Sequence, residues 1–264
     1  MSMTMRRKNT NGSPPAQGLY HPAQEHDACG IGFVANVRGH KSHEIISKGI
    51  QVLLNLTHRG ACGCDPETGD GAGILLQIPH QFFLRECRKL GFELPKPGAY
   101  GVGMTFLPVE KHERLQCEGI LERIIVEEGL TVLGWRDTPC FASAIGRVAR
   151  GSQPYIQQIF VGCGTLTDAD AFERRLYVVR KRAESEMASS GIQDAEVFHI
   201  PSLSCRTIVY KGLLLAPQIT NFYKELSDPD VTSAFPPIHF RVGNERIRIT
   251  TLRTMARSIR SRAT

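Results

Sequence analysis

The spacing of hydrophobic and polar positions divides this chain into alternating helices and strands. Apolar residues recur at helical spacing from Ile45 to Leu56, and Ser42 before them is a residue type that caps helix N-termini. A capping box at Thr167–Asp170 predicts a long helix that continues to about Met187. Further helices are expected near 80–90 and 110–128. Short apolar runs predict strands at 29–37, 71–78, 100–107, 131–136, 155–161, 197–200 and 205–215, the last as the hairpin partner of the one before it.

These alternating elements predict an α+β fold in which helices lie outside layered sheets. The 264 residues, 41% of them hydrophobic, suffice for one large domain or two small ones. No apolar run approaches the length of a membrane-spanning helix. Residues 1–28 are different, because they are polar, contain Pro14, Pro15 and Pro22, and show no hydrophobic period. We expect them to form a flexible leader without the apolar core of a signal peptide.

The net charge of +6 comes entirely from the C-terminal end. That segment, 241–264, has a single acidic residue, Glu245. Its arginines are Arg241, Arg246, Arg248, Arg253, Arg257, Arg260 and Arg262. The remainder of the chain is therefore neutral and exerts little attraction on a phosphate backbone.

The eight cysteines are too sparse for a disulfide scaffold and contain no C-x-x-C pair. Free thiols in a reducing compartment are expected, in the cytoplasm, with a plastid as the alternative. His58, Cys62 and Cys64 could bind a metal ion, but a structural zinc site needs a fourth ligand that this spacing does not supply. The glycine-rich loop 68–73 precedes a strand instead of joining a strand to a helix, so we do not expect it to bind phosphate. Its Asp70 is expected to accept hydrogen bonds from backbone amides in a turn.

Cys29 stands where the leader ends and the first strand begins. If residues 1–28 are removed, Cys29 becomes the N-terminus. Its α-amine, with an ordinary pKa near 8, can then accept the thiol proton, so that one residue supplies both nucleophile and base. A cysteine taken alone is more often a small buried hydrophobe.

Three segments carry a resemblance to a known family. They are 20–34 (YHPAQEHDACGIGFV), 58–74 (HRGACGCDPETGDGAGI) and 221–235 (NFYKELSDPDVTSAF). In this order they resemble the processing site and first strand, the next signature and a later signature of the glutamate synthase large subunit. The resemblance implies a class II glutamine amidotransferase domain with the four-layer αββα fold of N-terminal-nucleophile hydrolases.

The resemblance also implies the roles of individual residues. Cys29 would attack the carboxamide of L-glutamine and release ammonia, which a synthase domain adds to 2-oxoglutarate. Arg59 and Gly60 match the Arg-Gly pair whose backbone supports the site. A second interpretation of the same pair is that Arg59 and Gly60 close the preceding helix, with Gly60 as its cap. No cofactor is expected in this chain, whereas FMN, an iron–sulfur cluster and a small subunit are implied for a full-length enzyme.

After Phe235 we expect the resemblance to stop. The family continues with an arginine-bearing strand that binds the glutamine carboxylate. A His-Asn-Gly-Glu-Ile-Asn segment follows, and its Asn side chain and Gly amide form the oxyanion hole. Residues 236–264 contain none of these and show no strand or helix pattern. The domain is therefore expected to span 29–235 and to be incomplete at its C-terminal end, with little stability and little glutaminase activity.

The genetic code offers a reason for this departure. Met255–Arg260 can be written ATG GCG AGA TCA ATA CGC, with an A as the last base of Thr254. Reading from that A gives AAT GGC GAG ATC AAT ACG, which encodes Asn-Gly-Glu-Ile-Asn-Thr. The same shift from Phe235 to Thr264 spells a sequence that resembles the missing family segment. We therefore expect a change of reading frame near Phe235, together with the loss of a short stretch before it.

Two other classes of function remain as alternatives. The arginine-rich segment could contact nucleic acid or an acidic surface, which would make the chain a binding module. Cys62 and Cys64 could serve a redox or metal-binding protein instead. Retention of the protein on DNA would identify the binding module. Metal analysis of the purified protein would identify the metal-binding alternative.

Overall fold

The computed structural model describes residues 29–57, 65–69, 71–235 and 237–241. In this part of the chain, the strands form two four-stranded antiparallel sheets. The first sheet has the order β1 (Cys29–Phe33), β8 (Pro237–Arg241), β2 (Ala72–Gln77), β7 (Thr207–Gly212). The second has the order β4 (Thr131–Asp137), β5 (Tyr155–Gly162), β3 (Tyr100–Leu107), β6 (His199–Ser204).

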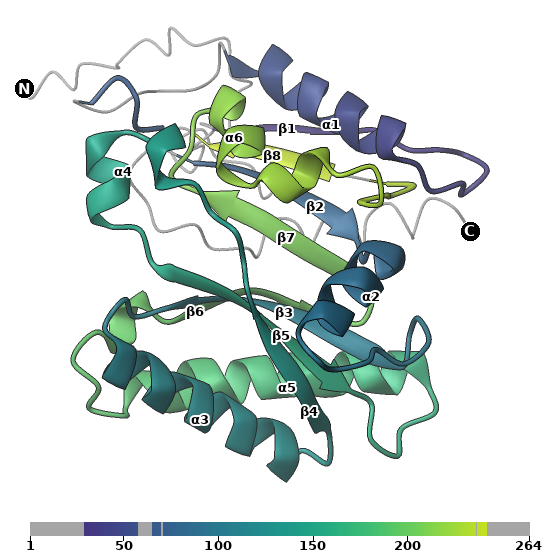
Figure 1. Cartoon of the computed structure of the whole chain (residues 1–264), viewed down its shortest axis with the longest axis vertical. Helices are drawn as coiled ribbons and strands as arrows, with labels where there is room; N and C mark the ends of the chain where they lie inside the picture. Colours follow the sequence, from purple (N-terminus) through teal and green to yellow (C-terminus); the bar gives the residue numbers. More distant parts are fainter. Residues whose placement is uncertain (1–28, 58–64, 70, 236, 242–264) are drawn as a thin grey trace, which may run out of the picture.

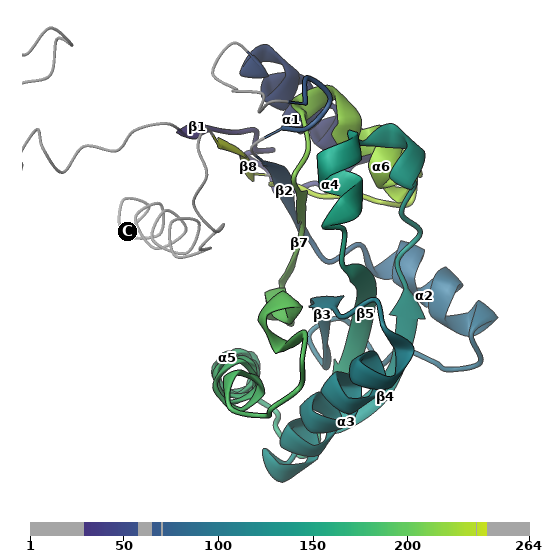
Figure 2. The same ribbon diagram turned by 90° about the vertical axis from the view of Figure 1, so that its left-hand side faces the viewer.

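Helices cover both ends of the molecule. The α-helices are α1 (His43–Asn55), α2 (His80–Lys89), α3 (Lys111–Glu127), α4 (Arg147–Gly151), α5 (Ala169–Ala188) and α6 (Ile219–Phe222). Short 3-10 turns are η3 (Ala142–Ala144), η4 (Ala195–Val197), η5 (Ala216–Gln218) and η6 (Lys224–Ser227). Figures 1 and 2 show the same order along the long axis: α1 and α6, the first sheet, the second sheet, then α3 and α5. The predicted α+β class, with antiparallel sheets and helices outside, is confirmed.

The helix ends differ in detail from the predictions. Ser42 caps α1 as expected, and its hydroxyl accepts a hydrogen bond from the Ile45 N–H at 3.4 Å. However, α1 ends at Asn55 with Leu56 as its C-cap, so the interpretation of Gly60 as the helix cap is wrong. At α5 the N-cap is Asp168, whose carboxylate accepts from two backbone N–H groups of the first turn. The helix therefore begins one residue later than predicted, and Asp168 alone caps it instead of a capping box on Thr167.

Two strand predictions are also corrected. The strands β6 and β7 follow each other closely but do not form a hairpin ladder, because β6 pairs with β3 and β7 pairs with β2. The expectation of no strand after Phe235 is wrong as well, since β8 lies between β1 and β2 and pairs with both. The unpaired backbone N–H and C=O groups of β1 and β2 can form hydrogen bonds with any extended segment that lies between them. The side-chain pattern of that segment therefore need not predict a strand.

The second sheet is buried on both faces. One face carries Val102, Met104 and Phe160, which belong to the same apolar cluster as the side chains of α1, α2, β2 and β7. The opposite face carries Ile159 and Val161, which pack with apolar residues of α3 and α5. The second sheet therefore links the two apolar clusters of the described structure.

Glu225 of η6 joins the two sheets through a buried network. Its carboxylate accepts from the Arg136 guanidinium of β4 at 2.8 Å, from the Tyr210 hydroxyl of β7 at 2.7 Å and from the Gln158 amide of β5 at 3.3 Å. The side chains of Glu225 and Arg136 are each only 5% exposed. Burial alone would lower the pKa of Arg136, but the Glu225 carboxylate outweighs it and the net shift is upward. Burial, together with the same carboxylate, raises the pKa of Tyr210 well above its usual range.

We predict that Glu225→Gln destabilises the protein by about 3 kcal/mol. Among the described residues, it leaves the buried Arg136 charge with Glu86, at 3.8 Å, as its remaining carboxylate partner. Adding Arg136→Met to this variant should restore part of the loss, because the buried charge is then gone. Urea unfolding measures both effects. Glu127→Gln, which removes an exposed carboxylate from α3, is the matched control and should stay close to wild type. Equal midpoints for Glu225→Gln and wild type would contradict the assigned role of Glu225.

Candidate active site

The start of β1 lies at the same end of the first sheet as the start of β2. Cys29 is paired with Arg241, and the next residue, Gly30, with Phe240 of β8. Phe240 is also paired with Ala72, the first residue of β2, and Ala72 with Gly212, the last residue of β7. The structure thus places the Cys29 backbone at this end of the sheet, whereas the Cys29 side chain lies outside the described residues.

The end of α1 lies beside β1. A Cβ atom placed on Gly30 would lie 3.4 Å from Leu56 Cδ1, so the end of α1 packs against the residue that follows Cys29. Leu56 precedes the predicted site residues by only a few positions. Arg59, Gly60, the proposed metal ligands His58, Cys62 and Cys64, and Asp70 lie outside the described residues.

Residues 65–69, which continue the same signature, anchor the short helix α4. The Asp65 carboxylate accepts from the Val148 N–H at 3.1 Å and from the Thr68 hydroxyl at 2.8 Å. The Thr68 hydroxyl in turn accepts from the Ala149 N–H at 3.3 Å. These bonds satisfy donors at the N-terminus of α4 and favour the charged carboxylate. The Val148 N–H is the largest cause of the lowered pKa of Asp65, and Thr68 adds to it.

Gly69 fixes the other side of this loop. A Cβ atom at this position would lie 2.3 Å from the Leu214 carbonyl oxygen, so only glycine fits without a backbone shift. Leu214 follows β7, which ends at the same edge of the sheet as β2 begins. The loop is therefore clamped between α4 and the segment after β7. Sequence reasoning missed Asp65 and Thr68, because their partners lie far along the chain.

Comparison with known families agrees with this arrangement. A model of class II glutamine amidotransferases matches residues 29–247. The chain belongs to the class II glutamine amidotransferase family. The match begins at Cys29, and it extends past Phe235, where the resemblance was expected to end.

The similar proteins are glutamate synthases. The NADPH-dependent large chain of Bacillus subtilis is 46% identical over 232 residues, which cover 88% of this chain and 15% of that protein. The ferredoxin-dependent glutamate synthase 2 of Synechocystis is 37% identical over 239 residues, which cover 90% of this chain and 15% of that protein. The NADH-dependent glutamate synthase of Saccharomyces cerevisiae is 38% identical over 238 residues, which cover 86% of this chain and 11% of that protein. This amidotransferase chain thus spans less than a sixth of the length of these relatives.

The thiols that the structure describes are free, and most are buried. Burial is the largest cause that raises the pKa of Cys117 to about 11 and of Cys87, Cys140 and Cys205 to about 12. These thiols stay protonated at neutral pH and are poor nucleophiles. Among the described residues, no group of three or more His, Cys, Asp or Glu side chains could hold a metal ion. None of the described helices combines the length and apolar composition of a membrane span.

We predict that Gly69→Ala destabilises the amidotransferase by about 1–3 kcal/mol, because the added methyl group forces apart the loop and the Leu214 backbone. Gly119→Ala in α3 is the matched control, since a Cβ there meets nothing within 4 Å. In mid-helix this control should stabilise by about 0.5–1 kcal/mol. Thermal unfolding should show a lower melting temperature for Gly69→Ala and a higher one for Gly119→Ala than for wild type. A Gly69→Ala variant as stable as wild type would show that the close approach to Leu214 is not a constraint.

Proposed function

We propose that this chain is the glutamine-hydrolysing domain of a glutamate synthase large chain and that Cys29, exposed by removal of residues 1–28, is its nucleophile. The observation that carries the proposal is the start of the family match at Cys29 itself. The position of Cys29 as the first residue of β1 supports it, because a chain that begins there presents its α-amine and its thiol together. The packing of Leu56 against Gly30 supports the placement of Arg59 and Gly60 beside this terminus.

The chemistry follows from the two groups of one residue. The α-amine takes the proton of the Cys29 thiol, and the thiolate attacks the carboxamide carbon of glutamine. Collapse of the tetrahedral intermediate breaks the C–N bond, and the α-ammonium returns its proton to the leaving nitrogen, which departs as ammonia. Water then hydrolyses the γ-glutamyl thioester to glutamate and the free thiol. None of these reaction steps is an oxidation or a reduction.

The fate of the ammonia is proposed from the relatives, which are named glutamate synthases. In such an enzyme the ammonia would be added to 2-oxoglutarate outside the span of this chain. FMN, the iron–sulfur cluster and the small subunit would likewise belong to the remainder of a full-length enzyme. The domain described here would contribute glutamine binding and hydrolysis.

The part of the C-terminal segment that follows the family match, 248–264, is proposed to be out of frame with respect to the family. β8 occupies the backbone position between β1 and β2 and ends at Arg241, but the Asn-Gly oxyanion donors of the family are missing from residues 236–264. Removal of one oxyanion donor typically costs about 2.7–4 kcal/mol of transition-state stabilisation. The chain as given is therefore proposed to be a weak glutaminase. The encoding DNA tests the frame directly, because one base out of phase it must spell the family segment.

Glutamine hydrolysis tests the function. Three chains that begin at Cys29 are compared by ammonia release: the sequence as given, a version with the family reading frame and the lost stretch restored, and the restored version with Cys29→Ser. The restored chain should be active, the given chain slower by about 10²-fold or more, and Cys29→Ser inactive. A fourth chain that retains residues 1–28 should also be inactive, because its Cys29 has no α-amine. Full activity of Cys29→Ser, or of the chain that retains residues 1–28, would refute the proposed nucleophile.

A further inference from the structure

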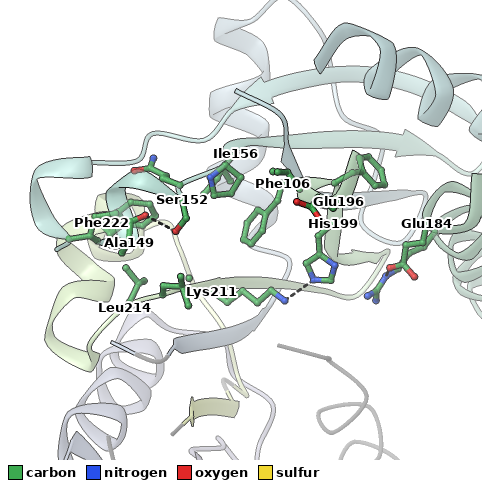
Figure 3. Close-up of a pocket in the computed structure, with 18 of the residues that line it drawn as sticks. Phe106, Ala149, Ser152, Ile156, Glu184, Glu196, His199, Lys211, Leu214 and Phe222 are labelled. Carbon is green, nitrogen blue, oxygen red and sulfur yellow. Dashed lines mark hydrogen bonds and ion pairs between the residues drawn. The ribbon is translucent and has the colours of Figure 1, made fainter. Parts of the chain in front are cut away.

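A cavity of about 910 Å³ lies between the two sheets and is lined by side chains from both. Figure 3 shows that its two ends differ in chemistry. Ala149, Leu214 and Phe222 form an apolar end, while Lys211 extends from β7 toward His199 of β6 and Glu184 of α5 at the polar end. Neither Lys211 nor His199 is used in the glutaminase mechanism.

Lys211 is held in place by His199. Its side chain is buried, with the residue 5% exposed, and its Nζ lies 2.7 Å from His199 Nε2. Burial lowers the pKa of His199 to about 3, so the imidazole is neutral and its Nε2 accepts a hydrogen bond from the Lys211 ammonium. The Lys211 Nζ also lies 5.9 Å from the centre of the Phe106 ring. These contacts fix the direction of the amine inside the cavity.

Arg180 supplies a second buried cation. The Arg180 Nε donates to the Glu184 carboxylate at 2.8 Å, and Glu184 also accepts from Lys181 Nζ at 2.6 Å. Arg180 is only 7% exposed, and the hydrogen bonds of its guanidinium within the described structure run through Nε. Its Nη groups therefore remain available as donors, and one carboxylate is shared by two cations.

The charges that face the cavity are predominantly positive. Among the described lining residues, the cations are Arg180, Lys181 and Lys211, and the carboxylates are Glu184 and Glu196. Burial, and then the positive charge of Arg180, lower the pKa of Lys211 to about 7, while Glu184 acts in the opposite direction. Two cations that repel each other in a buried space are both stabilised by an anion placed between them.

We propose that this cavity binds an organic carboxylate, with the carboxylate group on the Lys211 ammonium and the Arg180 guanidinium and the apolar body toward Leu214 and Phe222. Cationic nitrogen donors are the groups that recognise carboxylates, and charge-assisted hydrogen bonds of this kind are the strong ones. The apolar side chains of Leu214 and Phe222 favour an organic acid over inorganic phosphate, because they reward the burial of carbon. The proposal does not depend on glutaminase activity.

The cavity is nevertheless in contact with the signature loop 65–69. Leu214, which lines the cavity, carries the carbonyl group against which Gly69 packs. Ala149, another lining residue, donates its N–H to Thr68. A ligand that orders Leu214 or α4 would therefore order the loop that leads to β2.

Titration of the full chain with benzoate tests the proposal, with benzyl alcohol as the uncharged ligand of similar shape and inorganic phosphate as the anion without an apolar body. Benzoate should bind, and the other two should bind at least about tenfold more weakly. Lys211→Met should weaken benzoate binding by about tenfold or more, whereas Lys48→Met on exposed α1 should not change it. Because the ammonium form binds the anion, the affinity should fall as pH rises above about 7. Equal binding of benzoate and benzyl alcohol, or tighter binding of phosphate, would overturn the proposal.

Amine acetylation of the unmodified chain provides a second measurement that needs no variant. Benzoate should slow the acetylation of Lys211 by an N-hydroxysuccinimide ester, as followed by peptide mass spectrometry, and should leave Lys48 unaffected. Benzyl alcohol should protect neither lysine. If saturating benzoate leaves the acetylation rate of Lys211 unchanged, the carboxylate does not bind at this amine and the proposal fails.

Discussion

The buried carboxylate of Glu225 is the interaction on which the arrangement of the two sheets depends. It accepts hydrogen bonds from β4 and β5 of the second sheet and from β7 of the first. A charge in this position is tolerated only because the Arg136 guanidinium and two neutral donors replace water. Glu225 belongs to 221–235, one of the three segments by which the family was identified. This signature therefore has a structural role: it fixes the first sheet, and with it the β1 terminus, relative to the second.

Local patterns predicted most elements, because their signals are contained within one segment. The strand β3 matches its predicted bounds, and Pro108 directly after it cannot continue the ladder. The helix α1 follows from Ser42 and the apolar spacing behind it. The pairing between strands that are distant in the sequence could not be predicted from local patterns. The short link between β6 and β7 resembles a hairpin, but the Ser204 hydroxyl accepts from the Arg206 and Thr207 N–H groups and turns the chain toward the first sheet.

The same distinction applies to the site. Cys29 could be singled out because a leader, a strand and a family signature coincide there. The capping of α4 by Asp65 and Thr68 could not, because the partners come together only in the folded chain. The polar end of the cavity between the sheets could not be predicted either, since Lys211 and His199 lie on strands of different sheets. Each of these residues is of an ordinary type in the sequence, and its role is visible only beside its partner in the folded chain.

The central claim is that the sulfur of Cys29 acts on glutamine beside its own free amine. Covalent labelling by a glutamine-analogue alkylator, 6-diazo-5-oxonorleucine, tests it most directly in the chain with the restored reading frame. Mass analysis should show an N-terminus at Cys29 and a single adduct on that residue, and excess glutamine should prevent its formation. A mature chain that retains residues 1–28, or an adduct on another cysteine, would contradict the claim.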